Sequence, residues 1–218
     1  GRKRKKSSIG LHDLEKISFP LNYTTTTREH SFVPLNSESK NTIDQILSET
    51  EVGKNYGWVL GDSKNVPIIV DSEDNTISFP PIINAAVTTV TTKTKNILVE
   101  VTSLDKDAAE DMLSVVATIL QMAGFEITQL TISGKKNSTP KLNSKVIQYD
   151  VKLTEQILGL NLSPSAMISS LKKCRLDATQ KGKRIRCIIP RYRFDIFGPM
   201  DIVEEIVLGY GIENLEPK

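Results

Sequence analysis

Residues 95–102 (KNILVEVT) are the stretch of this sequence that most restricts its fold. Their β-branched and apolar side chains are typical of a buried strand, and one carboxylate, Glu100, interrupts them. Asp105 can cap a following helix, whose apolar residues recur at three- and four-residue spacing until Gly124 ends it. Residues 125–132 then return to a strand pattern. We therefore predict a β-α-β core for a first domain, in a chain of the α+β class.

Shorter elements are predicted before this core. Asn41 or Thr42 can cap a short helix over residues 43–48, because either side chain can accept a hydrogen bond from a free backbone N–H group of the first turn. Pro80 and Pro81 end the extended structure that precedes them. Extended segments are expected over residues 23–27, 56–60, 66–70 and 77–79, with a turn over residues 71–75.

A linker is predicted at residues 133–143, where Gly, Pro, Ser, Asn and Lys replace apolar residues. We accordingly predict two domains, with limits at residues 1–136 and 144–218. The second is the smaller one.

The second domain is predicted to hold strands and short helices. Thr154 is expected to cap a helix that ends at Gly159. Ser163 and Pro164 predict another helix start, because a capping residue precedes a proline at the first helical position. Strands are expected over residues 146–153 and 183–189, and a last helix over residues 200–208.

The charge of the chain is concentrated at its beginning. There are 28 basic and 26 acidic residues, a net charge of +2, and five of the basic ones lie within residues 2–6. Without these five, 23 basic residues face 26 acidic ones, so the rest of the chain is not a nucleic-acid binder in bulk. The opening run is either a local contact patch for nucleic acid or a solvated start.

Composition narrows the class of protein further. Apolar content of 39% and charged content of 25% are ordinary for a soluble globular protein, and no apolar run approaches the roughly 18 residues of a membrane span. Cys174 and Cys187 lack metal-type spacing, which favours reduced thiols in a cytosolic protein. Because the chain starts without Met and ends on Pro217 and Lys218, we expect a piece of a longer polypeptide.

The sequence holds no recognisable catalytic motif. We find no Gly-rich phosphate loop and no cluster of metal ligands, and neither His12 nor His30 stands in a nucleophile motif. His12 and Asp13 are adjacent, which fits either a catalytic pair or a surface loop. From the residues alone, the prediction stops at a two-domain α+β protein.

Three ordered motifs resemble a known family. SFPPIIN at residues 78–84 followed by KNILVEVT, and IPRYRFDI at residues 189–196 followed by DIVEEI and GYGI, are similar to signatures of the archaeal/eukaryotic phenylalanine–tRNA ligase beta subunit. The opening Arg-Lys-Arg and the later IGLHDL at residues 9–14 also match. The chain departs from the family at Lys95, at Ala85 and after Thr102, where Thr-Ser-Leu-Asp replaces the usual Thr-Gly-Thr-Asp.

The resemblance implies a fold and an activity. It implies a mixed-sheet editing domain, then a small winged-helix-like α/β module. In this family the editing domain hydrolyses tyrosine wrongly attached to tRNA(Phe). Glu100 would read the tyrosine hydroxyl, and the alternative is that it faces solvent. The other implied pocket residues are Thr102, which shares the strand face of Glu100, with Ser78, Ile69, Asn84 and His12.

The resemblance also implies partners. They are tRNA(Phe) carrying a misattached amino acid and the alpha subunit of an alpha2beta2 enzyme in the cytoplasm. That enzyme uses ATP and Mg²⁺, with no cofactor or metal in this piece and no membrane contact. The candidate tRNA contacts are Arg2, Arg4, Arg191 and Arg193.

Two alternatives stay open. The arginines of the second module, Arg184 and Arg186 included, either touch RNA phosphates or pair with neighbouring carboxylates in a packing role. The chain itself is either an editing hydrolase or a non-catalytic piece for tRNA docking and subunit assembly.

Overall fold

The computed structural model describes residues 4–133 and 138–215. Contacts divide the chain into two units, Gly1–Ala109 and Glu110–Lys218. The division falls near the start of helix α3 (Lys106–Met122), while the predicted linker includes residues 134–137, which lie outside the described residues. The predicted domain limits of 1–136 and 144–218 stay predictions.

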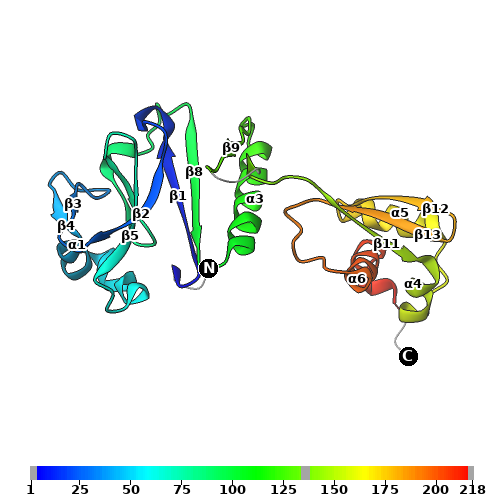
Figure 1. Ribbon diagram of the computed structural model, residues 1–218. Coiled ribbons are helices and arrows are strands. Elements are labelled where there is room, and N and C mark those ends of the chain that lie inside the picture. Colours follow the sequence, from blue (N-terminus) through cyan, green and yellow to red (C-terminus); the bar gives the residue numbers. More distant parts are fainter. Residues whose placement is uncertain (1–3, 134–137, 216–218) are drawn as a thin grey trace. The chain divides into compact units, whose positions relative to one another are not determined.

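Antiparallel strand pairs make up most of the first unit (Figure 1). Four strands form a sheet in the order β2-β5-β6-β7, while β1 pairs with β8 and β3 pairs with β4. The strands are β1 (Ser7–Asp13), β2 (Asn22–Thr27), β3 (Ser31–Phe32), β4 (Asn41–Thr42), β5 (Asn65–Val70), β6 (Thr76–Phe79), β7 (Ile83–Asn84) and β8 (Ile97–Ser103).

Strand β8 confirms the strand predicted over residues 95–102, but its partner is β1. Ser7 lies opposite Ser103 and Asp13 lies opposite Ile97. The prediction of a β-α-β core is therefore wrong. Residues 125–132 contain only the two-residue strand β9 (Leu130–Thr131), which pairs with β10 (Ser138–Thr139). Phe125 and Ile132 stay exposed, so this segment has no buried face to hold it as a longer strand.

The core of the first unit lies around two short helices, α1 (Ile43–Glu49) and α2 (Glu51–Tyr56). Thr42 caps α1 in a capping box with Gln45, which confirms the predicted helix. Single 3₁₀ turns are η2 (Leu14–Lys16), η3 (Gly57–Leu60) and η4 (Ala86–Thr88). The buried residues of this core are Phe32, Ile43, Ile46, Val66, Phe79, Ile82 and Ala85.

The strand predicted over residues 56–60 is wrong, because the chain there completes α2 and turns through η3. Thr50 caps α2 by accepting the N–H of Gly53 at 3.0 Å. Gly53 also packs so closely on α1 that a β-carbon would lie 1.9 Å from the carbonyl oxygen of Ile46. A cap and a close helix–helix approach thus outweigh the aromatic and β-branched residues that suggested a strand.

Helix α3 follows its prediction closely. Asp105 Oδ1 accepts the N–H of Ala108 at 2.7 Å, as the expected cap. Gly124 has a φ of +97°, a left-handed conformation that glycine adopts without strain and that ends the helix.

The second unit holds a three-stranded antiparallel sheet in the order β11-β13-β12 with three helices (Figure 1). Ser163 caps α5 as predicted. Asp150, however, caps α4 in place of the predicted Thr154, which is fully buried and donates to the hydroxyl of Tyr149. The elements are β11 (Lys145–Asp150), α4 (Val151–Leu158), α5 (Pro164–Lys173), β12 (Asp177–Lys181), β13 (Arg184–Ile189), α6 (Pro199–Tyr210) and the 3₁₀ turn η5 (Ile212–Asn214).

Strands β12 and β13 form a hairpin beside the helices, which confirms the helix-and-wing prediction and, with the first unit, the α+β class. The sequence of β12 is polar and does not predict a strand. This segment is a strand because it pairs with β13. Within residues 4–133 and 138–215, no helix is both long and apolar enough to cross a membrane.

Candidate functional site

Glu100 lies on one face of the β1–β8 pair, with Thr102 beside it. Side chains alternate along a strand, so this face also carries the residues opposite them on β1, namely Gly10 opposite Glu100 and Ser8 opposite Thr102. The hydroxyls of Ser8 and Thr102 are hydrogen-bonded at 2.7 Å. The predicted side-by-side arrangement of Glu100 and Thr102 is therefore present.

The carboxyl of Glu100 is buried and incompletely paired. The hydroxyl of Ser78 lies 3.4 Å from Oε1, while Oε2 is buried with no hydrogen-bond partner among the described residues. Burial raises the pKa of Glu100 to about 7, although the Ser78 contact acts in the opposite direction. The alternative that Glu100 faces solvent is wrong, and the carboxyl keeps an unused hydrogen-bonding position.

His12 is fully buried on the same face of β1. Its Nδ1 lies 2.8 Å from the hydroxyl of Thr88, and its Nε2 has no partner in the described part of the chain. Burial lowers the pKa of His12 to about 4, so the imidazole is neutral near pH 7. Asp13 points the other way and accepts the hydroxyl of Thr94 at 2.8 Å. His12 and Asp13 are therefore neither a surface loop nor a catalytic pair.

Gly10 brings Glu100 and His12 into the same space. A β-carbon on Gly10 would lie 2.7 Å from Oε1 of Glu100 and 2.8 Å from Nε2 of His12. A side chain at residue 10 would therefore force the ends of the Glu100 and His12 side chains to move. The two polar groups thus share the volume over one glycine, an arrangement that sequence reasoning did not find.

The neighbouring sheet supplies the other predicted pocket residues. Ser78 on β6 lies opposite both Ile69 on β5 and Asn84 on β7. The Ser78 hydroxyl is 3.1 Å from Oδ1 of Asn84, whose Nδ2 donates to the carbonyl of Leu11 at 3.4 Å. Glu100, Ser78 and Asn84 are therefore joined by contacts, Ile69 borders them, and Thr102 and His12 lie on the strand pair beside them.

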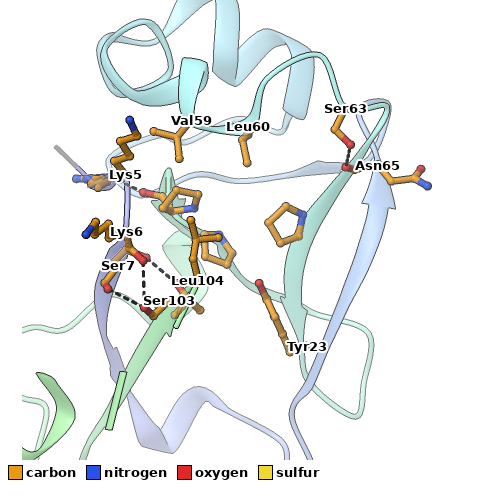
Figure 2. Close-up of a pocket in the computed structure, with 16 residues that line it drawn as sticks. Lys5, Lys6, Ser7, Tyr23, Val59, Leu60, Ser63, Asn65, Ser103 and Leu104 are labelled. Atoms are coloured by element: carbon orange, nitrogen blue, oxygen red, sulfur yellow. Dashed lines mark hydrogen bonds between the residues drawn. The ribbon is translucent and has the colours of Figure 1, made fainter. Parts of the chain in front are cut away.

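A cavity of about 290 Å³ adjoins this site at Thr102 (Figure 2). Lys6 and Ser7 lie on one side of it and Tyr23, which is 66% exposed, on another. Burial, and to a lesser degree the charge of Glu100, raise the pKa of Tyr23. Further lining residues include Lys5, Ser8, Pro67, Pro80, Pro81 and Leu104. The cavity combines cations, hydroxyls and an aromatic ring.

Arg4, a predicted tRNA contact, is engaged within the unit. Its guanidinium donates to the carbonyls of Pro81, at 3.1 Å, and Ile82, and lies 4.2 Å from the ring centre of Tyr56. Arg2 lies outside the described residues. Lys5 and Lys6 are the exposed cations at this end of β1, and the opening basic run was the signal that pointed to them.

Comparison with known proteins finds two domain families that match the chain. The profile of the B3/4 domain matches residues 5–114, and that of the tRNA synthetase B5 domain matches residues 147–212. The phenylalanine–tRNA ligase beta subunits of Archaeoglobus fulgidus and Methanocaldococcus jannaschii are 37% and 40% identical over 100% and 97% of this chain. The chain belongs to the B3/4-domain family of phenylalanine–tRNA ligase beta subunits.

A solved structure agrees with this assignment. An N-terminal fragment of the phenylalanyl-tRNA synthetase beta-subunit from Pyrococcus horikoshii superposes with a TM-score of 0.91 at 31% identity, over 97% of this chain and 62% of that one. The chain spans 40% of the length of the Archaeoglobus relative and 39% of the Methanocaldococcus relative. The B3/4 match includes every residue of the Glu100 site.

In the B5 domain, the predicted pairing of arginines with carboxylates is confirmed for Arg193. Its guanidinium binds Asp195 at 2.7 Å and Glu205 at 2.5 Å, and these hydrogen bonds raise its pKa above the usual range. Arg191 pairs with Asp111 at 2.5 Å. Both arginines named as tRNA contacts therefore already hold anionic partners within the second unit.

Proposed function

We propose that the B3/4 domain hydrolyses the ester between tyrosine and tRNA(Phe). The observation that carries this proposal is the buried carboxyl of Glu100, which retains an oxygen without a partner among the described residues. A buried polar atom left unpaired costs about 1–3 kcal/mol, so the site favours a ligand that supplies the missing hydrogen bond.

The chemistry of discrimination supports a hydroxyl as that ligand. Tyrosine differs from phenylalanine by one hydroxyl, and an apolar synthetic pocket rejects an added hydroxyl only weakly. A second site that requires the hydroxyl removes the error, because phenylalanine leaves the buried carboxyl unpaired. Ser78, Asn84 and Ile69 border the carboxyl from the adjoining sheet.

The cavity beside Thr102 has the chemistry to receive the RNA end of the substrate. Lys5 and Lys6 supply cations for phosphate oxygens, and Tyr23 supplies an aromatic face for a base. We propose that a water molecule attacks the ester carbonyl, assisted by the terminal ribose hydroxyl of the tRNA. The protein orients the ester and excludes phenylalanine, the correctly attached amino acid.

Deacylation of Tyr-tRNA(Phe) and Phe-tRNA(Phe) by this chain tests the proposal. We expect preferential hydrolysis of Tyr-tRNA(Phe), and a roughly ten- to hundredfold loss of that preference in Glu100→Ala. Glu38→Ala, which changes an exposed carboxylate of the same unit, is the matched control and should behave as the wild type. A Glu100→Ala variant with the wild-type preference would refute the assignment.

For the B5 domain we propose a packing and assembly role, because Arg193 and Arg191 hold carboxylate partners. Binding of tRNA at several salt concentrations tests this. Arg193→Gln should leave the salt dependence of binding unchanged, whereas an RNA-phosphate contact would lower the slope by about one.

We further propose that the whole enzyme pairs this subunit with the alpha subunit in an alpha2beta2 assembly. In that assembly the ATP- and Mg²⁺-dependent attachment of phenylalanine takes place in the alpha subunit, in the cytoplasm. The alternative, a non-catalytic docking and assembly piece, predicts no deacylation of either tRNA by this chain.

A further inference from the structure

Two buried atoms on one strand face lack hydrogen-bond partners among the described residues, Nε2 of His12 and Oε2 of Glu100. Both side chains pack against Gly10, where a β-carbon would come within 3 Å of each. The cavity beside Tyr23 reaches the next residue pair on this face, Ser8 and Thr102. Ser8 and Thr102 are one residue pair along this face from Gly10 and Glu100.

The contact between Thr88 and Nδ1 of His12 couples the direction of the Thr88 hydroxyl to the tautomer of the imidazole. The Thr88 hydroxyl has one proton, and the carbonyl of Ala85 accepts it at 3.4 Å. In this arrangement the lone pair of the same hydroxyl faces Nδ1 of His12 at 2.8 Å and the ring hydrogen is on Nδ1, whereas a Thr88 proton turned towards Nδ1 would put the ring hydrogen on Nε2. His12 is neutral because burial lowers its pKa to about 4, and with the ring hydrogen on Nδ1 its Nε2 is a bare acceptor.

The contacts of Ser78 leave Glu100 without a strong donor. The single hydroxyl proton of Ser78 has two acceptors within reach, Oδ1 of Asn84 at 3.1 Å and Oε1 of Glu100 at 3.4 Å. The nearer oxygen belongs to Asn84. A carboxylate with so little hydrogen bonding is poorly stabilised in a buried site, which fits the rise of its pKa to about 7.

We propose that the site binds a tyrosine hydroxyl with one fixed hydrogen-bond polarity. The hydroxyl donates its proton to Nε2 of His12 and accepts the proton of a neutral Glu100 carboxyl. Thr88 is the positioning residue that sets this polarity. The inference rests on the proposed editing function. A phenol has one proton to donate, so a bare Nε2 and an ionised Glu100 would compete for it, and only a protonated Glu100 pairs both.

The other groups that face Glu100, on β2, β6 and β7, carry no positive charge that would stabilise an ionised carboxylate. Tyr23 on β2 is neutral, because burial and Glu100 raise its pKa above the ordinary value. Ser78 on β6 and Asn84 on β7 are uncharged. Phenylalanine would leave Nε2 and the Glu100 hydroxyl unpaired together, so the proposed pair rejects it more strongly than one carboxyl would.

The pH dependence of the deacylation ratio tests this polarity. The rate with Tyr-tRNA(Phe) divided by the rate with Phe-tRNA(Phe) cancels the general effect of hydroxide on esters. We expect this ratio to fall about tenfold per pH unit above the pKa of Glu100, as the protonated fraction falls. In Glu100→Gln the ratio should not change with pH, because the amide donates without titrating.

Three outcomes of these rate measurements would overturn the proposal. A wild-type ratio that rises with pH, or one that stays flat, would refute the polarity while leaving the editing function intact. The absence of any preference for Tyr-tRNA(Phe) would refute the editing function and the polarity together.

Thr88 offers a matched pair of variants and a readout independent of activity. Thr88→Ser keeps the hydroxyl and should keep the ratio, whereas Thr88→Val removes it and should lower the ratio several-fold. Long-range ¹H–¹⁵N correlation spectra of the wild-type chain report which nitrogen of His12 is protonated, with His30→Gln resolving the second histidine. Protonation at Nδ1 is expected, and protonation at Nε2 would overturn the proposal even if Thr88→Val failed to fold.

Discussion

At the scale of single residues, burial on one strand face shifts the pKa values of two titrating groups in opposite directions. Burial disfavours the charged form of each, which raises the pKa of Glu100 to about 7 and lowers that of His12 to about 4. The contribution of Glu100 to stability is present below pH 4.5 and lost as the pH rises through about 7. That of His12 is present above pH 6.5 and lost as the pH falls through about 4.

Between pH 4 and 7 the stability contributions of Glu100 and His12 change with pH in opposite directions. A variant that lacks one titrating group should therefore show the pH dependence of the other. We expect the free energy of unfolding of Glu100→Gln to rise from pH 4 to 6.5, by up to about 1.4 kcal/mol per pH unit. The wild type should change less over that range. Urea unfolding at a series of pH values measures both, and parallel curves would show that the opposing pKa shifts are absent.

Gly10 is the residue on which this arrangement depends. Gly10→Ala would place a methyl group within 3 Å of Glu100 and His12, so we expect a loss of about 1–3 kcal/mol of stability together with loss of tyrosine selectivity. Gly198→Ala is the control, since a β-carbon there has no atom within 4 Å. Thermal unfolding of both variants checks the prediction, which equal stabilities would contradict.

At the scale of elements, local hydrogen bonds decide most boundaries. The turn predicted over residues 71–75 joins β5 to β6, and the carboxylate of Asp71 organises it. This side chain accepts the backbone N–H groups of Ser18, Glu73 and Asn75, at 3.3, 3.0 and 2.9 Å. Such a turn is readable from sequence because its partners are neighbours along the chain.

Asp71→Ala should destabilise the first unit by about 1–3 kcal/mol, because three backbone N–H groups would lose the buried carboxylate that accepts their hydrogen bonds. Asp62→Ala, at an exposed aspartate, should change stability by less than about 0.5 kcal/mol. Chemical denaturation of the two variants makes the comparison. Similar midpoints would mean that the turn does not depend on this carboxylate.

At the scale of the whole molecule, the described residues form two separate hydrophobic cores, one in each unit. In the second unit, α5 and α6 approach so closely that a β-carbon on Gly209 would lie 2.1 Å from the carbonyl oxygen of Ser170. Because this contact is with backbone, no side-chain rotation can relieve it.

Gly209→Ala should therefore destabilise the B5 core while leaving the B3/4 domain folded. Amide hydrogen exchange checks this: protection should fall in β13 and α6 and remain in β1 and β8. Gly198→Ala lies in the same unit, but its β-carbon would have no atom within 4 Å, so this variant should keep the protection in both units. Parallel loss of protection in both units would show that the two cores unfold together.

The candidate site could be predicted only in part. Glu100 stands out because a carboxylate interrupts an apolar strand, and the family resemblance supplied its role together with Ser78, Ile69 and Asn84. Gly10 and Thr88 were missed, because each matters only through a side chain far away in sequence. Thr88 meets His12 across 76 positions, and Gly10 meets Glu100 through the pairing of β1 with β8.

The sequence by itself determined the helix starts at Thr42, Asp105 and Ser163, and the strands around Ile69 and Glu100. These follow from hydrogen bonds and periodicities that span only a few residues. The tertiary structure alone decided that β1 is the partner of β8, and hence that His12 and Glu100 are buried over the same glycine. The physical reason is that strand pairing and burial depend on segments about 90 residues apart, whose contact no local pattern records.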